Sequence, residues 1–461
     1  MATDALETDY LIVGAGAMGM AFADEVLVRD KNSQIVMVDK HARPGGHWND
    51  AYSHVTLHQP AAFYGVNSED LGPGGSALVS GTEVLAYYER VLEKLKATGR
   101  LRFFSQSEYT GDGKIRSLVE SDSEFRVEVR KKIVDATYMK VEVPSIRPPA
   151  YGVAKGVWLE APNALSRLAD APTGYVIIGA GKTGIDAVLF LLEQGVSPQR
   201  IQWIMPNDAW LLDRARLAPG KIAEGLLQLD GFGHAETLEE LFSVLESLGN
   251  VLRLDANVWP TKYRCATVSK EELGQLRRIE NVIRQGRVVR IQADSIELEE
   301  GTLPTGPTVL HVDCTADGLA KREVRPIFEG ARITLQSVSM CQQVFSASLI
   351  GYVETRFSDE KKMNEICKVV PHPEFSQDFI LSSVLTNQNF TRWLKEFPRW
   401  VLGSRLSISH HDSTLRLLIA AFRTRKAVAG SNENLKRLVE REFPGDESSG
   451  SPKQSLGGEN N

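Results

Sequence analysis

The chain has 461 residues, of which 42% are hydrophobic and 24% charged, and its formal net charge at pH 7 is -6. This length predicts two or three domains, and the apolar share is ordinary for a protein that folds around substantial cores. The acidic balance gives no electrostatic argument for nucleic acid or an anionic membrane as a partner, and the sequence contains no uninterrupted apolar run of about twenty residues.

The cysteines are widely spaced and form no CxxC pair: Cys265, Cys314, Cys341 and Cys367. The dithiol relay of a disulfide reductase is therefore not expected, and no metal-ligand spacing is evident. Four cysteines in a chain of this length argue against a disulfide scaffold and fit a reducing compartment. Each cysteine is therefore interpreted as a small buried hydrophobic residue. Residues 1–9 lack the basic and apolar regions of a signal peptide, which makes the cytoplasm the expected location.

A glycine motif follows the first predicted strand. The apolar run 9–13 indicates a buried strand, and residues 15–28 have the pattern of a helix. Between them begin three glycines with the spacing of a dinucleotide loop, Gly14, Gly16 and Gly19. In such a loop the glycines permit a tight turn, close approach of the backbone to a pyrophosphate and tight helix–strand packing, with the phosphates at the helix N-terminus.

The next predicted strand supplies an acidic residue at the expected distance. Residues 34–38 end in Asp39, about twenty residues after the last glycine, where a carboxylate reaches ribose hydroxyls. Lys40 follows and is included with Asp39 among the cofactor-binding candidates. A glycine motif alone is also compatible with a flexible turn, but the order of strand, glycines, helix, strand and acid favours a nucleotide site.

The same pattern recurs in the middle of the chain. Residues 175–178 predict a strand, and residues 183–194 predict a helix. The candidates between and within them are Gly179, Gly181, Thr183 and Gly184. A duplicated motif indicates that the chain binds two dinucleotides, which points to redox chemistry.

The strand after the second motif ends differently from its counterpart. Residues 201–205 run into a Pro-Asn-Asp turn, so no acid ends the strand itself. An acid there favours a free 2′-hydroxyl and repels a 2′-phosphate, so its absence leans modestly toward NADP(H), with NAD(H) still possible. Arg214 and Arg216 lie close downstream and are candidates for pairing with a phosphate, although acids lie nearby and surface arginines are common.

Breaks in the pattern divide the chain into domains. The proline-rich segment 143–149 predicts an extended connector, and residues 303–307 predict a return to the first domain. Helical spacing dominates the chain from residue 387 to residue 443. The predicted domains are a first part at 1–150, an inserted second domain at 151–305, the rest of the first domain at 306–370, a helical region at 371–445 and a disordered tail at 446–461.

Three segments resemble class B flavoprotein monooxygenases, the flavin-containing monooxygenase group. They are Gly-Gly-His-Trp at 45–48, which is similar to the GGxW signature beside FAD, the second helix start at 181–187, and the helix at 82–88. The resemblance implies an α/β fold with two Rossmann-like dinucleotide-binding domains, in which an NAD(P) domain is inserted into an FAD domain, plus a helical C-terminal region. It adds Gly46, His47 and Trp48 to the FAD candidates.

The resemblance also implies a chemistry, in which reduced flavin captures O2 as a C4a-hydroperoxide that is transferred to a small or medium organic substrate. In the active-site loop, His58 suits a proton donor or a base, and Gln59 suits the amide that relatives take from asparagine; alternatively, both cap backbone groups. Asp317 resembles a late segment that closes over FAD, although Asp-Gly is also a turn signal. Arg325 and Gln336 are further candidates for contact with the flavin pyrimidine.

One departure from the group limits the assignment. Residues 151–159 lack the histidine of its Phe-x-Gly-x-x-x-His segment, which weakens a Baeyer–Villiger interpretation. The main hypothesis is an FAD- and NAD(P)H-dependent monooxygenase; the alternatives are a flavoprotein dehydrogenase or oxidase, and a non-catalytic nucleotide-binding redox sensor. Neither nucleic acid nor a membrane is expected as a partner, and the substrate and the oligomeric state stay open.

Overall fold

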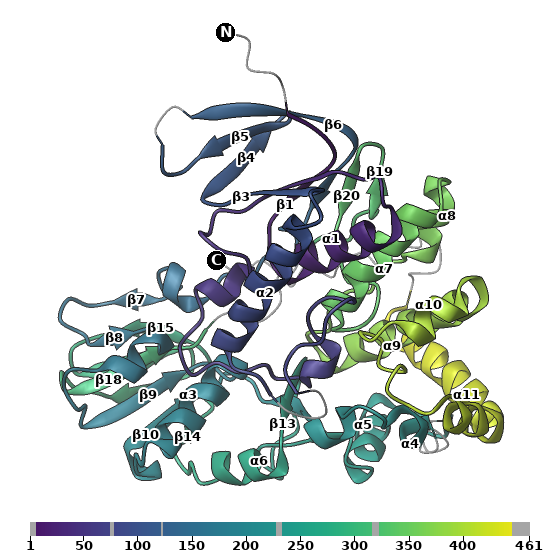
Figure 1. The fold of residues 1–461 in the computed structure, drawn as a ribbon. Helices are drawn as coiled ribbons and strands as arrows, with labels where there is room; N and C mark the ends of the chain where they lie inside the picture. The colour runs from purple at the N-terminus through teal and green to yellow at the C-terminus, as the bar shows by residue number, and fades with distance from the viewer. Residues whose placement is uncertain (1–5, 74–77, 121–122, 227–232, 316–321, 445–461) are drawn as a thin grey trace.

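The computed structural model describes residues 6–73, 78–120, 123–226, 233–315 and 322–444. Two sheets of mainly parallel strands, each with helices packed on it, form separate layers, and a group of C-terminal helices lies to one side (Figure 1). The predicted α/β class, with two Rossmann-like units and a helical C-terminal region, is confirmed.

The first sheet surrounds the first glycine motif. Its strands are β1 (Leu6–Val13), β2 (Ile35–Val38), β3 (Leu101–Phe104), β4 (Ser107–Gly111), β5 (Lys114–Ser117), β6 (Glu124–Asp135), β19 (Phe328–Glu329) and β20 (Arg332–Thr334). The order is β19-β20-β6-β1-β2-β3, and β4 and β5 extend the sheet beside β6. The central strands β1 and β2 are buried almost throughout, which explains why both read as continuous apolar runs.

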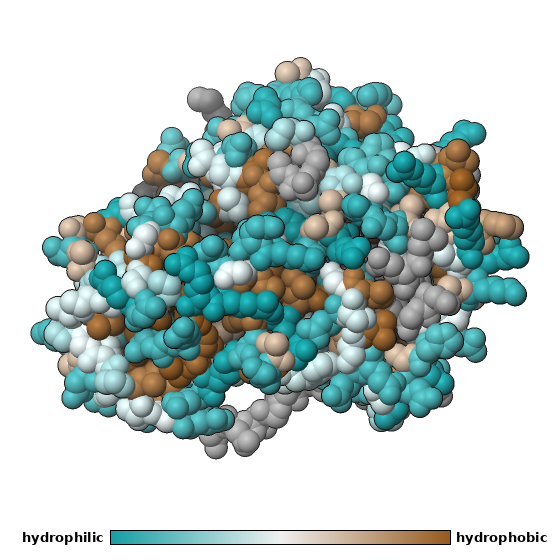
Figure 2. All heavy atoms as spheres, turned by 90° about the horizontal axis from the view of Figure 1, so that it is seen from below, coloured by the Kyte–Doolittle hydropathy of each residue, from teal (hydrophilic) through white to brown (hydrophobic). Residues whose placement is uncertain are grey.

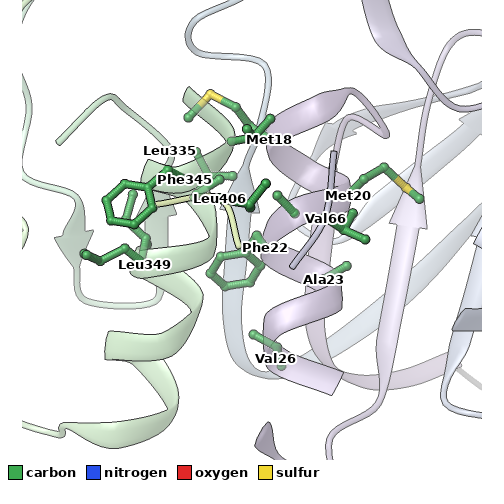
Figure 3. Packing of buried hydrophobic residues seen from close by; sticks show 14 of the residues in the cluster. Met18, Met20, Phe22, Ala23, Val26, Val66, Leu335, Phe345, Leu349 and Leu406 are labelled. Atoms are coloured by element: carbon green, nitrogen blue, oxygen red, sulfur yellow. The ribbon is translucent and has the colours of Figure 1, made fainter. Parts of the chain in front are cut away.

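Three helices pack around this sheet: α1 (Ala17–Arg29), α2 (Gly81–Lys96) and α7 (Gln343–Arg356). Met18 and Phe22 of α1 lie against the side of α7 that carries Phe345 and Leu349 (Figure 3). The two helices approach closely at Gly351, where a Cβ would lie 3.2 Å from the Phe22 carbonyl oxygen. A helix far along the sequence therefore completes the core beneath the first glycine motif.

The second sheet surrounds the second glycine motif. Its strands are β8 (Leu159–Glu160), β9 (Gly174–Ile178), β10 (Ile201–Ile204), β14 (Val282–Ile283) and β18 (Val309–Asp313), in the order β14-β10-β9-β18-β8. All of these strands run parallel, and α3 (Lys182–Glu193) follows β9.

The predicted return to the first domain at residue 306 is wrong. Strand β18 pairs with β9 over its whole length, so it belongs to the second sheet. Its apolar pattern fits the core of either sheet, and only the pairing partner distinguishes them. The chain rejoins the first sheet at β19 and β20, where β20 pairs with β6.

Smaller elements complete the second unit. One short sheet contains β11 (Ala209–Asp213), β12 (Val251–Leu252) and β13 (Lys262–Val268), and another contains β7 (Gly152–Val153), β15 (Val288–Ile291), β16 (Ser295–Leu298) and β17 (Gly301–Pro304). The helices are α4 (Ile222–Leu226), α5 (Leu238–Ser247) and α6 (Lys270–Leu276).

The C-terminal region consists of α8 (Glu360–Ile366), α9 (Ser376–Glu396), α10 (Pro398–Gly403) and α11 (Thr414–Glu442). Ile380 of α9 and Leu438 of α11 share a core with Trp210 and Tyr263 of the short sheet that contains β11.

None of the described helices has the length and apolarity needed to cross a bilayer. The face shown in Figure 2 is largely hydrophilic, with apolar residues in separate patches. The predicted tail at 446–461 lies outside the described residues.

The interpretation of every cysteine as a small buried hydrophobe is wrong for one pair. Cys265 of β13 and Cys341, two residues before α7, form a disulfide across a sequence separation of 76 residues. The other two, Cys314 and Cys367, are buried free thiols as expected. The disulfide was missed because its partners come together only when the second unit packs against the first.

Candidate active site

The first glycine loop has the conformation that its sequence requires. Gly14 has a φ of 102°, and a Cβ there would lie 2.9 Å from a methyl group of Thr137. A Cβ on Gly19 would overlap the Gly14 carbonyl oxygen. Gly16 is the N-cap of α1, and no side chain caps this helix end. The loop therefore leaves backbone N–H groups at a helix N-terminus, where an anion is stabilised.

The second glycine loop repeats this geometry. Gly179 has a φ of 120°, and a Cβ there would lie 2.7 Å from the Cys314 carbonyl oxygen, while a Cβ on Gly184 would overlap the Gly179 carbonyl oxygen. Gly181 is the N-cap of α3, again without a side-chain cap. Apart from its chain neighbours, no atom of the residues that the structure describes lies within 4 Å of the position of a Cβ on Gly181, so among these residues the middle of the loop faces open space.

Asp39 joins the first glycine loop to the strand that follows it. Its Oδ2 accepts a hydrogen bond from the Ala15 N–H at 2.6 Å, and its Oδ1 contacts the His41 ring at 2.8 Å. The hydrogen bond to Asp39, together with a second to Asp50, raises the pKa of His41 to about 9. The carboxylate thus lies at the loop, and its contact with ribose hydroxyls stays a prediction. Lys40 is exposed and pairs with Glu108 at 3.1 Å.

The Gly-Gly-His-Trp segment lies against the first glycine loop. The Gly45 N–H donates to the Ala15 carbonyl at 2.9 Å, and a Cβ on Gly46, whose φ is 57°, would lie 3.0 Å from the Gly16 Cα. Trp48 is buried and donates its ring N–H to the Tyr64 hydroxyl at 2.8 Å. These contacts leave no room for side chains between the two loops.

His47 and His58 both keep exposed surface although protein surrounds them closely. Desolvation lowers the pKa of His47, and it lowers the pKa of His58 to about 4, with a smaller effect from the charges of Lys182 and Arg214. At neutral pH His58 is therefore an uncharged ring that accepts a proton or a hydrogen bond. Of the two predicted roles for this side chain, its environment favours the base over the proton donor.

The segment that contains His58 runs from the first unit onto the second. The Tyr52 hydroxyl donates to Asp186 of α3 at 2.7 Å, and Asp186 also pairs with Lys182. The Tyr52 hydroxyl also contacts the side chain of Thr183. The His58 carbonyl accepts a hydrogen bond from Thr267 of β13. Gln59 follows and is half-buried. The predicted candidates of the active-site loop thus lie where the two glycine-motif units meet.

Arg214, a candidate for pairing with a phosphate, is only partly satisfied within the described residues, because its Nε is buried without a hydrogen-bond partner. It is buried at the start of a short 3-10 helix, Arg214–Leu217, and pairs with Glu272 at 2.6 Å. Arg216 donates to the Leu248 carbonyl at 3.0 Å. Burial beside Glu272 decides this arrangement, and the partner lies too far along the sequence for the spacing of the arginines to reveal it.

An ion pair that the sequence did not reveal lies after the end of β10. Asp208 is buried, and Arg284 donates two hydrogen bonds to its carboxylate, at 2.7 and 3.0 Å. A bidentate pair neutralises this acid near the place where the sequence predicts a ribose or its phosphate. The separation of 76 residues between the partners is why no local pattern indicated it.

The remaining candidates are placed as follows. The Gln336 amide donates to the Arg325 carbonyl at 2.8 Å and accepts from the Arg325 N–H at 3.2 Å, so both of its polar atoms bind the backbone. Asp317 lies outside the described residues. Within the described part of the chain, no cluster of three or more His, Cys, Asp and Glu side chains is arranged to hold a metal ion.

The comparisons with known proteins agree with this geometry. Residues 12–71 match the family of NAD(P)-binding Rossmann-like domains. Over 86% of this chain and 99% of the other, the fold matches cyclohexanone-bound cyclohexanone monooxygenase in the rotated conformation, with 13% identity and a TM-score of 0.51. A closed structure of cyclohexanone monooxygenase matches 92% of this chain and 99% of its own, with 14% identity and a TM-score of 0.50.

These matches confirm the resemblance to class B flavoprotein monooxygenases at the level of the fold. Much closer in sequence is "Uncharacterized protein Rv2000" of Mycobacterium tuberculosis, which is 42% identical over 462 aligned positions, covering 94% of this chain and 85% of the relative. "Uncharacterized protein Mb2023" of Mycobacterium bovis matches with the same identity and coverage. The chain therefore belongs to the protein family of Rv2000 and Mb2023.

Proposed function

We propose that the protein is an FAD-dependent, NAD(P)H-using oxidoreductase, and specifically a monooxygenase that acts with O2 on a small or medium organic molecule. The observation that carries the proposal is the pair of matching glycine loops at the N-termini of α1 and α3, both without a side-chain cap. Their occurrence in a chain with the fold of cyclohexanone monooxygenase supports the assignment of both loops to redox dinucleotides.

The residues of the first unit fit FAD. Backbone N–H groups at the start of α1 suit the pyrophosphate, and the packing of the Gly46 segment on the first glycine loop leaves a cradle without side chains. The residues assigned to FAD are Gly14, Gly16, Gly19, Asp39, Gly46, His47 and Trp48. With the corrected boundary, the proposed FAD domain comprises residues 1–150 and the chain from residue 322 to residue 370.

The residues of the second unit fit NAD(P)H. The open space above Gly181 and the uncapped start of α3 suit a second pyrophosphate, with Gly179, Thr183 and Gly184 in the same loop. Arg284 compensates the charge of Asp208, so this carboxylate does not repel a 2′-phosphate as an unpaired acid would. This arrangement favours NADPH over NADH.

The groups of the active-site loop determine what the protein itself contributes. Bound FAD would accept a hydride from NAD(P)H and activate O2. His58 is neutral at physiological pH, so its ring is available as a base or a hydrogen-bond acceptor, and the Gln59 amide is available as a donor. The hydrogen bonds of the same segment to Asp186 and Thr267 hold it against the second unit, which limits the entry of water.

The first test is a visible absorption spectrum of the purified protein, followed by anaerobic titration with NADPH and with NADH and then by admission of air. We expect flavin bands that NADPH bleaches at a lower concentration than NADH, and O2 consumption on reoxidation. Cyclohexanone is the first organic probe, because the fold neighbour binds it. A colourless protein, or a flavin that neither nucleotide reduces, would exclude the proposed function.

Two alanine variants separate the two nucleotide sites. Gly181→Ala places its Cβ in open space and requires no unusual φ, so we expect an unchanged melting temperature and flavin content but a rate of reduction by NADPH that falls by about tenfold or more. Gly16→Ala, whose Cβ would lie 3.6 Å from Gly46, is expected to lower the flavin content instead. Gly274→Ala in α6 also places its Cβ more than 4 Å from every described residue outside its own helix backbone and its chain neighbours, and it is the matched control. Normal reduction of Gly181→Ala by NADPH would contradict the assignment of the second site.

An oxidase or dehydrogenase is the second candidate, because residues 151–159, which run through β7 to the first residue of β8, contain no histidine. Stoichiometric hydrogen peroxide from NADPH and O2, without an oxygenated product from cyclohexanone or from a wider panel of ketones and amines, would favour this candidate over the monooxygenase.

A further inference from the structure

The first half of α11 exposes large apolar side chains on one face. Leu415, Ile419 and Phe422 have exposed fractions of 66%, 44% and 70%. Their spacing of four and three residues places them on one line along the helix. The other side of the helix packs against α9 and α4, with Ala420 and Thr424 buried. The exposed line is therefore not a core face that is locally distorted, but the outward face of a packed helix.

Basic residues flank this line on both sides. Arg416 and Arg423 each follow a line residue by one position, a quarter turn to one side, and Arg425 lies a quarter turn to the other side. Lys426 continues the line, and all four basic side chains are exposed. None of the four forms an ion pair with another residue of the described part of the chain. The Arg425 guanidinium lies 4.5 Å from the Phe422 ring centroid, alongside the apolar line.

The charge of this segment is opposite to that of the whole chain. Residues 414–426 contain four basic and no acidic residues, whereas residues 427–442 contain three of each, and the whole chain has a net charge of -6. The expectation that a membrane is not a partner rested on the net charge, which conceals this local concentration. An apolar line with arginines on both sides is the pattern of a helix that lies in a membrane interface, where acyl chains cover the apolar groups and anionic headgroups neutralise the cations.

We infer that the outward face of α11 between Leu415 and Lys426 docks on an anionic lipid surface. A second copy of the chain is disfavoured as the occupant, because pairing two such faces brings eight uncompensated cations together, four from each copy. Nucleic acid is disfavoured because it would leave the exposed phenylalanine and aliphatic side chains in contact with polar phosphates. A lipid surface matches both the charge and the apolar character.

The test is sedimentation of the purified full-length protein with vesicles of phosphatidylglycerol and phosphatidylcholine, and with vesicles of phosphatidylcholine alone. We expect binding only to the vesicles that contain phosphatidylglycerol, and weaker binding at high salt because screening shortens the range of the attraction. The measurement needs neither turnover nor a reduced cofactor, so its result is independent of the proposed oxidoreductase activity.

Two sets of variants identify the face. Changing Leu415, Ile419 and Phe422 together to Gln removes the exposed apolar line without removing a core side chain, and Gln is a good helix former. We expect the affinity for the vesicles to fall by at least about tenfold. Changing Arg416 and Arg423 to Gln is expected to cost about thirtyfold, at about 1 kcal/mol for each cation. Val119→Gln, at a side chain that is 64% exposed elsewhere, and Lys436→Gln, in the second half of α11, are the matched controls and should bind like the wild type.

Three results would overturn the inference. The first is the absence of binding to vesicles that contain phosphatidylglycerol. The second is equal binding of the wild type and the apolar variant, with circular dichroism showing that both are folded. The third is a dimer in solution, measured by light scattering, that the change at Leu415, Ile419 and Phe422 dissociates, because that would make a second copy the occupant of the face.

Discussion

His54 is a neutral histidine enclosed between two rings. Its ring stacks on Phe190 with centroids 4.1 Å apart and contacts Tyr52 at 4.6 Å, and neither ring nitrogen has a hydrogen-bond partner in the described part of the chain. Desolvation lowers the pKa of His54 to about 4, against about 6.5 in an unfolded chain. The unfolded state therefore binds the proton more tightly. The contribution of His54 to stability is complete above about pH 6.5 and is lost as the pH falls toward 4.

His54→Phe should remove this pH dependence, because phenylalanine keeps the stacked ring but does not titrate. Between about pH 7.5 and about pH 5, we expect the variant to lose less of its free energy of unfolding than the wild type. Urea unfolding at both pH values, followed by tryptophan fluorescence, gives the comparison. An equal loss in the two proteins would show that His54 is hydrated in the folded state.

At the level of elements, the disulfide connects the two nucleotide-binding units. Cys265 lies in β13, two residues before the Thr267 that holds the active-site loop, and Cys341 lies next to the start of α7. Both cysteines have a positive φ, of 55° and 56°, which non-glycine residues rarely adopt. The surrounding structure therefore holds two backbone segments in a conformation that allows the bridge.

Cys265→Ser should lower the free energy of unfolding by about 2–4 kcal/mol, because the unfolded chain regains the conformations that the bridge excludes. The difference should vanish when both proteins are unfolded in the presence of dithiothreitol. Maleimide labelling of the denatured wild type should detect only Cys314 and Cys367 before reduction, and all four cysteines afterwards. Labelling of all four without reductant would show that the bridge does not form.

A second contact between elements ties the C-terminal region to the loop after the active-site segment. Arg405 is buried and donates to the carbonyls of Val66, Ala62 and Tyr64 at 2.7, 2.9 and 2.5 Å. Three backbone acceptors of the first unit thus share one side-chain donor that follows α10.

Arg405→Met keeps most of the side-chain volume but removes the three hydrogen bonds that Arg405 donates to these carbonyls. Each buried unsatisfied group costs about 1–3 kcal/mol, so we expect the free energy of unfolding to fall by about 3 kcal/mol or more. Arg399→Met, at an exposed position of α10, is the control and should change it by less than about 0.5 kcal/mol. Equal effects of the two substitutions, measured by denaturant unfolding, would contradict the structural role of Arg405.

For the molecule as a whole, the sequence predicts what short-range patterns determine. Each strand–glycine–helix unit is specified within about thirty residues, so both glycine loops could be located, including the glycines that a Cβ would obstruct. The C-terminal helices follow from their apolar spacing in the same way.

Features that depend on partners far along the chain could not be predicted. The pairing of β18 with β9, the ion pairs of Arg214 and Arg284, and the disulfide all join segments whose local sequences fit other arrangements equally well. The environment of His58 could not be predicted either, because the local sequence around it shows neither the desolvation of its ring nor the cations that lie near it in the fold. The sequence thus indicates which groups take part, and the packing of the two units determines their charge states and contacts.

This packing leads to a prediction about how the two units cooperate. The Tyr52 hydroxyl is buried and donates to Asp186 of α3, close to the second glycine loop, so it helps to fix the second nucleotide site relative to the first. If the two units carry the hydride donor and acceptor as proposed, Tyr52→Phe should leave flavin content and melting temperature almost unchanged. The rate of flavin reduction by NADPH should fall by about tenfold, because hydride transfer is sensitive to small misplacements.

Anaerobic stopped-flow reduction measures this rate directly. Ser53→Ala is the matched control, since it removes a hydrogen bond of 2.7 Å between the same loop and Ser166, but at an exposed site where water replaces the lost partner. Slow reduction of Tyr52→Phe together with normal reduction of Ser53→Ala would identify the buried bond as the one that aligns the units. Normal reduction of both variants would mean that other contacts, such as that between Thr267 and the His58 carbonyl, are sufficient for the alignment.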